Sequence, residues 1–162
     1  MSRRFLLPFA VCLVLAPACS TISGLTGSGE PTAVWVPGEV QAQDDRLLLD
    51  VTALALQKSG FPIGTGVDPN SLTIRSGWHN SLAPFKGKGY REMCEVRYEK
   101  QGSRKYKVAV RVRHEKNDDL HRPLDLSYAE WVPEADDVDR ARIVLQHIHS
   151  LLDTDIEVGE KP

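Results

Sequence analysis

Histidine is the residue type in this chain best suited to acid–base or metal chemistry, but its spacing favours neither. His147 and His149 lie two residues apart in a segment with helical periodicity, so their rings point in different directions and cannot chelate one ion. His114 and His121 flank an acidic loop that offers at most a loosely held cation. A metal site needs a cluster of three or four ligands, so we predict no metal site. The remaining histidine is His79.

Nucleophilic and phosphate-binding motifs are also missing from the sequence. Cys94 occupies an inward position in an alternating segment, which is typical of a buried structural thiol and not of a reactive one. Lys86-Gly87-Lys88-Gly89 lacks the ending of a phosphate-binding loop, and it precedes a predicted strand instead of a helix. No hydrolase motif occurs. We therefore predict a protein that is not an enzyme, with no catalytic residue and no cofactor.

Residues 1–18 have the composition of a bacterial export signal. Arg3 and Arg4 form the positive n-region, and Ala16-Pro17-Ala18 supplies the small residues that a signal peptidase needs. The uncharged apolar stretch from Phe5 to Leu15 is shorter than the roughly 20 residues that span a bilayer. The pattern predicts a signal peptide that is removed, not a permanent transmembrane helix.

Cys19 follows these small residues directly. The stretch Leu15-Ala16-Pro17-Ala18-Cys19-Ser20 resembles a bacterial lipobox, whose cysteine becomes the acylated first residue of the mature chain, although Leu15 stands one position too far upstream. In that pattern Ser20 favours the outer membrane, and several acyl chains such as palmitate give stable anchoring. We predict an outer-membrane lipoprotein on the periplasmic side. Because Ala16-x-Ala18 is also an ordinary cleavage site, a soluble periplasmic protein is the alternative.

Composition and charge further limit the kinds of protein that this chain can be. The chain has 162 residues, of which 41% are hydrophobic and 26% charged, which is enough for one domain with its own core. Its net charge of −2 provides no excess of positive charge to neutralise phosphates, so a strongly basic nucleic-acid binder is excluded. We expect a membrane and an envelope protein as partners, and no nucleic acid.

The periodicity predicts a tether, one domain and a short tail. Residues 19–43 hold the lipidated cysteine and a Gly-rich flexible tether, within which residues 33–36 offer a short edge strand or a partner-binding segment. The domain covers 44–153 and the tail 154–162. The domain begins with a helix over 44–59, capped by Asp44 or Asp45. It ends with an amphipathic helix capped by Asp136 or Asp137.

Between these helices the residues alternate as in strands. The runs 90–100 and 105–114, joined by a Gly turn, predict a hairpin with one apolar and one charged face. Residues 71–78 predict a further strand and 124–132 a fourth. Since one sheet face is apolar, we expect an α+β two-layer sandwich of three to four antiparallel strands, with both helices packed on that face.

The charged strand face and one long connection are the candidate partner-binding features. Basic side chains outnumber acidic ones on the outward positions of the hairpin, so this face could dock an acidic partner, or it could simply be solvated. The connection over 78–89 carries aromatic residues and could equally be an ordinary crossover loop. The candidate residues are Trp78, Phe85, Arg97, Lys107, Arg111 and Arg113.

The order of these elements resembles that of a known family. A helix over 44–59, a strand with Ile74-Arg75-Ser76-Gly77-Trp78, Tyr90-Arg91 leading into the hairpin, and a last amphipathic helix are similar to the domains of the helix-grip lipoproteins in the outer-membrane β-barrel assembly machinery. The resemblance implies a helix-grip-like fold after a lipidated cysteine, and no catalytic residues. That family usually carries two such domains and a long N-terminal partner-binding segment, whereas this chain has one domain and a short tether.

These observations lead to two functional hypotheses. The first is a non-enzymatic accessory or binding module in the assembly of outer-membrane proteins, which works by being tethered beside its partner. The second is a periplasmic carrier that holds a lipid or another small apolar ligand between sheet and helices.

Overall fold

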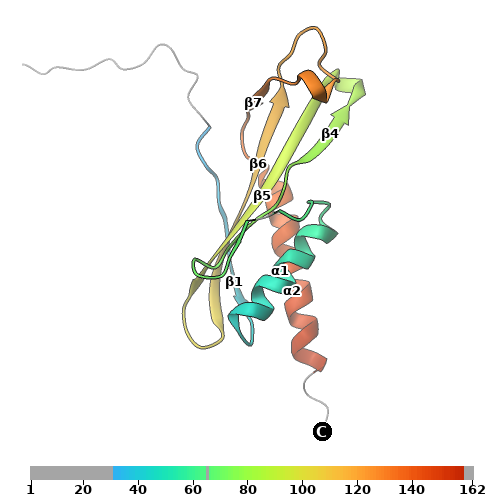
Figure 1. Ribbon diagram of the computed structural model, residues 1–162. Helices are drawn as coiled ribbons and strands as arrows, with labels where there is room; N and C mark the ends of the chain where they lie inside the picture. The colour runs from blue at the N-terminus through green and yellow to red at the C-terminus, as the bar shows by residue number, and fades with distance from the viewer. Residues whose placement is uncertain (1–30, 65, 159–162) are drawn as a thin grey trace, which may run out of the picture.

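A computed structural model describes residues 31–64 and 66–158, with side chains through Asp153. In this part of the chain the architecture is α+β, with a seven-stranded antiparallel sheet and two α-helices (Figure 1). The strands are β1 (Val36–Gln41), β2 (Gly66–Asp68), β3 (Thr73–Arg75), β4 (His79–Ala83), β5 (Lys88–Lys100), β6 (Lys105–Asn117) and β7 (Trp131–Pro133). The helices are α1 (Asp45–Lys58) and α2 (Val138–Val158), and two 3-10 turns are η1 (Pro84–Lys86) and η2 (Leu126–Tyr128). The predicted α+β class is confirmed, whereas three to four strands was too few.

The two long strands β5 and β6 form the central hairpin of the sheet. Val96 lies opposite Val110 in its register, and the hairpin turn is at 101–104. One edge of the hairpin pairs first with β1 and, farther along β6, with β7. The other edge pairs with β4 at the start of β5 and with β3 farther along it, and β2 extends the sheet beyond β3. Two long strands thus hold five short ones.

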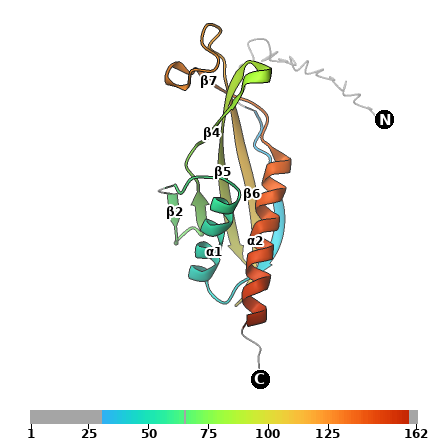
Figure 2. The ribbon, with the colours of Figure 1, turned by 90° about the vertical axis from the view of Figure 1, so that its right-hand side faces the viewer.

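Both helices cover the apolar face of the sheet, and Figure 2 shows them in front of it. Leu48 of α1, Val110 of β6 and Ile148 of α2 are completely buried in one core. The Asp44 carboxylate accepts a hydrogen bond from the Leu47 amide and caps α1 as predicted. Gly60, at φ +83°, ends the helix in the left-handed conformation that suits glycine.

Four segments differ from the sequence-based expectations. Residues 36–41, expected in the tether, form edge strand β1, where Pro37 needs no hydrogen-bond partner for its missing N–H. The strand expected at 124–132 is reduced to β7, because the Asp125 side chain accepts a hydrogen bond from Ser127 N and starts η2 instead. The 78–89 connection contains β4 and η1, and α2 continues to Val158 through part of the expected tail.

The hairpin is longer than the helical layer that covers it. Its end formed by the start of β5 and the finish of β6 projects beyond α1 and α2, together with β4, β7 and the loops at 84–87 and 118–130 (Figure 1). We call this region the tip. The other end of the hairpin carries the 101–104 turn.

Candidate binding face on the uncovered side of the sheet

Outward side chains of β5 and β6 form a face that no described helix covers, and we call it the outer face. The register places Glu95 opposite Arg111 and Arg97 opposite Ala109 on this face. Of the sequence-predicted candidates, Arg97, Lys107, Arg111 and Arg113 all belong to it, and Trp78 stacks on it. Phe85 does not, since it lies in η1 at the tip.

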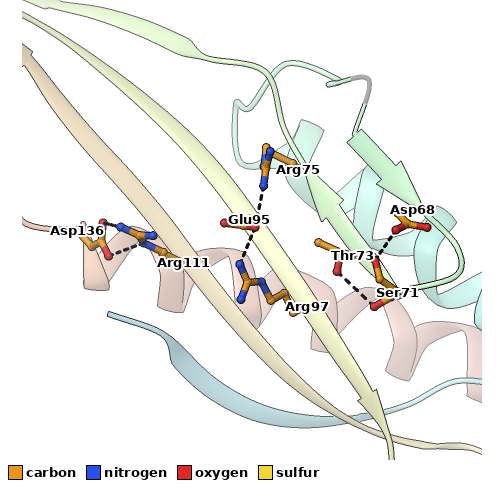
Figure 3. A network of polar contacts seen from close by, with 8 residues as sticks. All are labelled: Asp68, Ser71, Thr73, Arg75, Glu95, Arg97, Arg111 and Asp136. Atoms are coloured by element: carbon orange, nitrogen blue, oxygen red, sulfur yellow. Dashed lines mark hydrogen bonds and ion pairs between the residues drawn. The ribbon is translucent and has the colours of Figure 1, made fainter. Parts of the chain in front are cut away.

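Arginines on the outer face cover buried carboxylates. Glu95 accepts hydrogen bonds from Arg75 of β3 at 3.1 Å and from Arg97 at 3.0 Å (Figure 3). Its side chain is only 6% exposed, against 56% and 55% for the two arginines. Burial alone would raise the pKa of Glu95, but the hydrogen bonds from Arg97 and Arg75 outweigh it and the pKa is lowered. The carboxylate therefore stays ionised and fixes both guanidinium groups.

A second pair ties the outer face to the start of α2. Arg111 donates two hydrogen bonds to Asp136, at 2.7 and 3.2 Å, in the bidentate arrangement shown in Figure 3. Asp136 also accepts a hydrogen bond from the Val34 amide at 2.7 Å, so the segment before β1 is held at the same point. Sequence analysis considered Asp136 as a helix cap, but Asp137 plays that part by accepting from the Arg140 amide.

The third carboxylate, Glu115, lies nearer the tip. Arg91 of β5 approaches one of its oxygens at 2.6 Å, and Arg113 approaches the other at 3.1 Å. The Glu115 side chain is 5% exposed, although it stands on a face without a covering helix. The side chains that bury it are the arginines themselves and the tryptophans stacked on them.

All three tryptophans of the chain stack on arginines of the outer face. The Arg91 guanidinium lies between two indoles, 4.2 Å from the ring centre of Trp78 and 4.7 Å from that of Trp131. Trp35, just before β1, lies 4.2 Å from the Arg97 guanidinium. Each contact is a cation–π interaction, and each indole remains partly exposed.

Below Trp35 the outer face is hollowed into an open groove of about 510 Å³. Pro37 and Ala109, which are paired across β1 and β6, line it with small apolar side chains. Arg97 and Lys107 lie at its sides. Lys107 is exposed and makes no ion pair with any residue that the structure describes. Glu39 and Glu99, which flank Lys107 in the register, also line the groove. The groove therefore offers a small apolar surface next to both basic and acidic groups.

A separate polar cluster lies on the helical side of the sheet, between the core and the tip. Glu92 accepts a hydrogen bond from His114 at 3.2 Å and lies 3.0 Å from Arg140 Nε of α2, an ion pair outside hydrogen-bond geometry. The hydrogen bond to Glu92 raises the pKa of His114, despite its partial burial. Because these contacts join β5, β6 and α2, the cluster acts as a clasp between the three elements.

Cys94, Cys19 and the tryptophan sites complete the comparison with the sequence-based expectations. Cys94 is completely buried, and desolvation by burial raises the pKa of its thiol, in agreement with a structural role. Cys19 lies outside the described residues. Sequence reasoning placed Trp35 in a possible partner-binding segment and Arg91 on the charged strand face, but it missed Trp131 as a site residue. Nothing local indicated that two indoles would stack on Arg91.

Among the described side chains, no group of three or more histidines, cysteines and carboxylates is arranged to hold a metal ion. Neither helix in the described ranges has the length and apolar character needed to cross a membrane. No protein-family model and no curated protein matches this sequence.

Proposed function

We propose that this protein is a non-enzymatic outer-membrane lipoprotein that binds an acidic envelope protein through its outer face. Cys19 would anchor it on the periplasmic side, and its task would be to assist the assembly of outer-membrane proteins. The observation that carries the proposal is the gathering of all three tryptophans with arginines on the sheet face left free by the helices.

The residue types on this face are those that contribute most to protein–protein binding. Tryptophan and arginine are enriched among the residues whose loss costs an interface most. Here they are also held in place before a partner arrives, because Glu95 and Glu115 fix the guanidiniums and the indoles stack on them. Side chains that are already ordered lose less conformational entropy on binding.

The charge of the face favours an acidic partner. Its buried carboxylates are already engaged by arginines, and its exposed charged groups are Arg75, Arg97, Lys105 and Lys107 together with Glu39 and Glu99, which flank Lys107 in the register. Basic groups therefore outnumber acidic ones among the exposed side chains that a partner would meet. Complementary charge of this kind speeds association and selects among partners.

An anchor would make a modest affinity sufficient. Confining a binding module and a membrane-bound partner to one surface raises their effective concentration without any new contact. The α+β order and the helices on one sheet face are also compatible with the helix-grip resemblance, which we keep as part of the proposal.

The interior gives the alternative carrier function no support. The cavity between α1 and β3, lined by Leu56 and Ile74, has a volume of about 20 Å³. A larger open hollow of about 600 Å³ beside β1 and α2 is lined mainly by polar residues such as Lys105 and His149, which do not suit an apolar ligand. A lipid or a comparable ligand needs a site of several hundred Å³. Fully buried side chains such as Val96, Val108 and Val110 occupy the space between the sheet and the helices.

Intact-mass analysis of the mature protein tests the anchor. We expect the N-terminal residue to be Cys19 carrying acyl chains, and a Cys19→Ser variant to lose both this mass and its membrane association. An unmodified thiol on the wild-type protein would contradict the anchor and favour the soluble periplasmic alternative.

Site-specific photo-crosslinking in the envelope tests the face. A photoreactive residue at Lys107 should capture a partner, and one at Gln146, an exposed position on α2, should not. Substituting Lys107→Gln should weaken binding of the captured partner, more so at low salt, whereas Lys58→Gln, an exposed lysine on α1, should leave it unchanged. Equal capture at both positions, or a partner whose contact surface is not acidic, would overturn the proposal.

A further inference from the structure

Large apolar side chains are exposed at the tip in a way that folding does not explain. Phe85 in η1 is fully exposed, and Leu120 in the 118–130 loop is 89% exposed. Leu82 of β4, Leu124 and Tyr128 are also exposed beside them. Isolated exposed apolar residues are common on protein surfaces, but a group gathered at one end of a molecule marks a surface that binds something.

The 118–130 loop is fastened to the start of β5. The Gly89 amide of β5 donates to the Pro123 carbonyl at 2.9 Å. A side chain at Gly89 would lie 3.2 Å from Leu126 of η2 and 3.5 Å from Leu82 of β4, so η2 and β4 both approach β5 closely at this glycine. The 118–130 loop and the segment from β4 to η1 that carries Phe85 therefore lie at the same end of β5.

A buried asparagine holds the longer loop in shape. Asn117 is 1% exposed; its Nδ2 donates to the carbonyls of Arg122 and Pro123, and its Oδ1 accepts from the amides of Asp119 and Glu130. Asp119 in turn accepts from the backbone amides of His121 and Arg122 farther along the loop. These hydrogen bonds fix the loop in a conformation that presents Leu120 outward.

The direction of β1 places the tip on the side of the proposed anchor. β1 runs antiparallel to β6, with Val36 opposite Val110, so the chain before Val36 runs toward the Asn117 end of β6. The described chain thus begins at the tip end. Only residues 20–30 separate Cys19 from Pro31, the first residue that the structure describes. A Gly-rich chain of this length has an average end-to-end distance of about 20 Å.

We propose that the tip inserts Phe85 and Leu120 into the lipid interface of the membrane that carries the anchor. This inference rests on the proposed lipidation of Cys19 and adds a second contact with the bilayer. The chemistry fits a lipid surface: aromatic and aliphatic side chains enter the interface, while Lys86 and Arg122 can reach the headgroups and the exposed Asp118 and Glu130 stay in water. The strands would then point toward the bilayer, leaving the outer face open sideways to a partner.

A fluorescent probe tests the insertion. Phe85→Cys can be labelled with an environment-sensitive dye in the lipidated full-length mature protein, because Cys94 is completely buried. The labelled protein is reconstituted in vesicles of phosphatidylethanolamine and phosphatidylglycerol. We expect nitroxide groups on the acyl chains to quench this dye. The same dye at Ser103→Cys, in the turn at the opposite end of the hairpin, should not be quenched.

Substitutions in the labelled protein provide the matched comparison. Leu120→Ser should reduce the quenching at position 85, whereas Ile63→Ser, which removes an exposed apolar side chain away from the tip, should not. An unquenched dye at position 85 in lipidated protein would overturn the insertion while leaving the anchor intact, and would assign the tip to a protein partner. Equal quenching at 85 and 103 would overturn the orientation. An unmodified Cys19, detected by mass, would remove the anchor and this inference with it.

Discussion

Individual carboxylates on the outer face show how a charged strand surface can be structural and still remain available for binding. Glu95, Glu115 and Asp136 lie beneath the arginines that they hold, so the acidic groups are buried and the basic ones are partly exposed. Ion pairing between these carboxylates and the arginines does not by itself require tryptophans stacked on the guanidinium groups. The stacking of Trp78 and Trp131 on Arg91 therefore distinguishes this face from an ordinary solvated one.

Removing one of these carboxylates should destabilise the fold. In Glu115→Gln, Arg91 and Arg113 lose the negative charge between them, and we expect a loss of about 1–3 kcal/mol in the free energy of unfolding. The value should stay below that for a fully buried pair, because both arginines are partly solvated. Urea denaturation measures it. Glu99→Gln, at an exposed position on the neighbouring strand β5, should change stability by less than about 0.5 kcal/mol; equal losses for the two variants would contradict the assigned role.

The clasp around Glu92 should make stability depend on pH. The pKa of His114 is raised above its ordinary value of 6.5 by the hydrogen bond to Glu92, so its stabilising contribution is full below pH 6.5 and declines as pH rises through the raised pKa. The difference in unfolding free energy between wild type and His114→Gln should therefore be larger at about pH 6 than at about pH 9. Denaturant titrations at both pH values provide the measurement. A difference that grew toward the higher pH would contradict the protonated state.

Sequence patterns predicted the secondary-structure elements unevenly, for physical reasons. The β5–β6 hairpin was recognisable because its residues alternate over many positions and a Gly turn joins them, and α1 was recognisable from its cap and stripe. β1 and β4 were not, because Pro37 and Gly38 interrupt one and the other has no alternation. Both exist because the long hairpin offers them a free edge, which is a property of the sheet and not of their own residues.

The candidate site likewise combines positions that local sequence patterns predict with positions that depend on the tertiary structure. The outward position of Arg97, Lys107, Arg111 and Arg113 follows from strand parity, and that much was predictable. Asp136 and Trp131 reach the face from segments that are distant along the chain from their partners, which no local pattern indicates.

The segment between α1 and β3 depends on one close backbone approach. A Cβ atom on Gly64 would overlap the Arg75 carbonyl oxygen and lie 2.7 Å from the Ser76 carbonyl carbon, and both neighbours are backbone atoms that cannot rotate away. Gly64→Ala should lower the unfolding free energy by about 1–3 kcal/mol or displace this segment from β3. Gly102→Ala, in the hairpin turn, has nothing within 4 Å of the new atom and should be nearly neutral. Thermal unfolding of the two variants compares them; similar melting temperatures would contradict the close approach.

At the scale of the whole molecule, the tip and the core differ in how they are held. The middle of the hairpin is covered by both helices, whereas β4 and β7 each pair with one strand and extend beyond the helical layer (Figure 1). A region with few buried apolar contacts opens more easily than a core does.

Hydrogen exchange should show this difference directly. Amides of β5 and β6 near Val96 and Val110 should exchange only with global unfolding, and those of β4 and β7 much faster. Membrane reconstitution should slow the tip amides if the tip enters the lipid interface, without changing those of the core. Uniform protection along the whole hairpin would contradict this division.

The placement of the indoles has a practical consequence for spectroscopy. All three tryptophans stack on guanidinium groups of one sheet face, so the tryptophan emission of the protein, excited selectively, originates from that face alone. Binding that displaces those arginines should change the tryptophan emission without any added dye, whereas rearrangements around α1 should not change it.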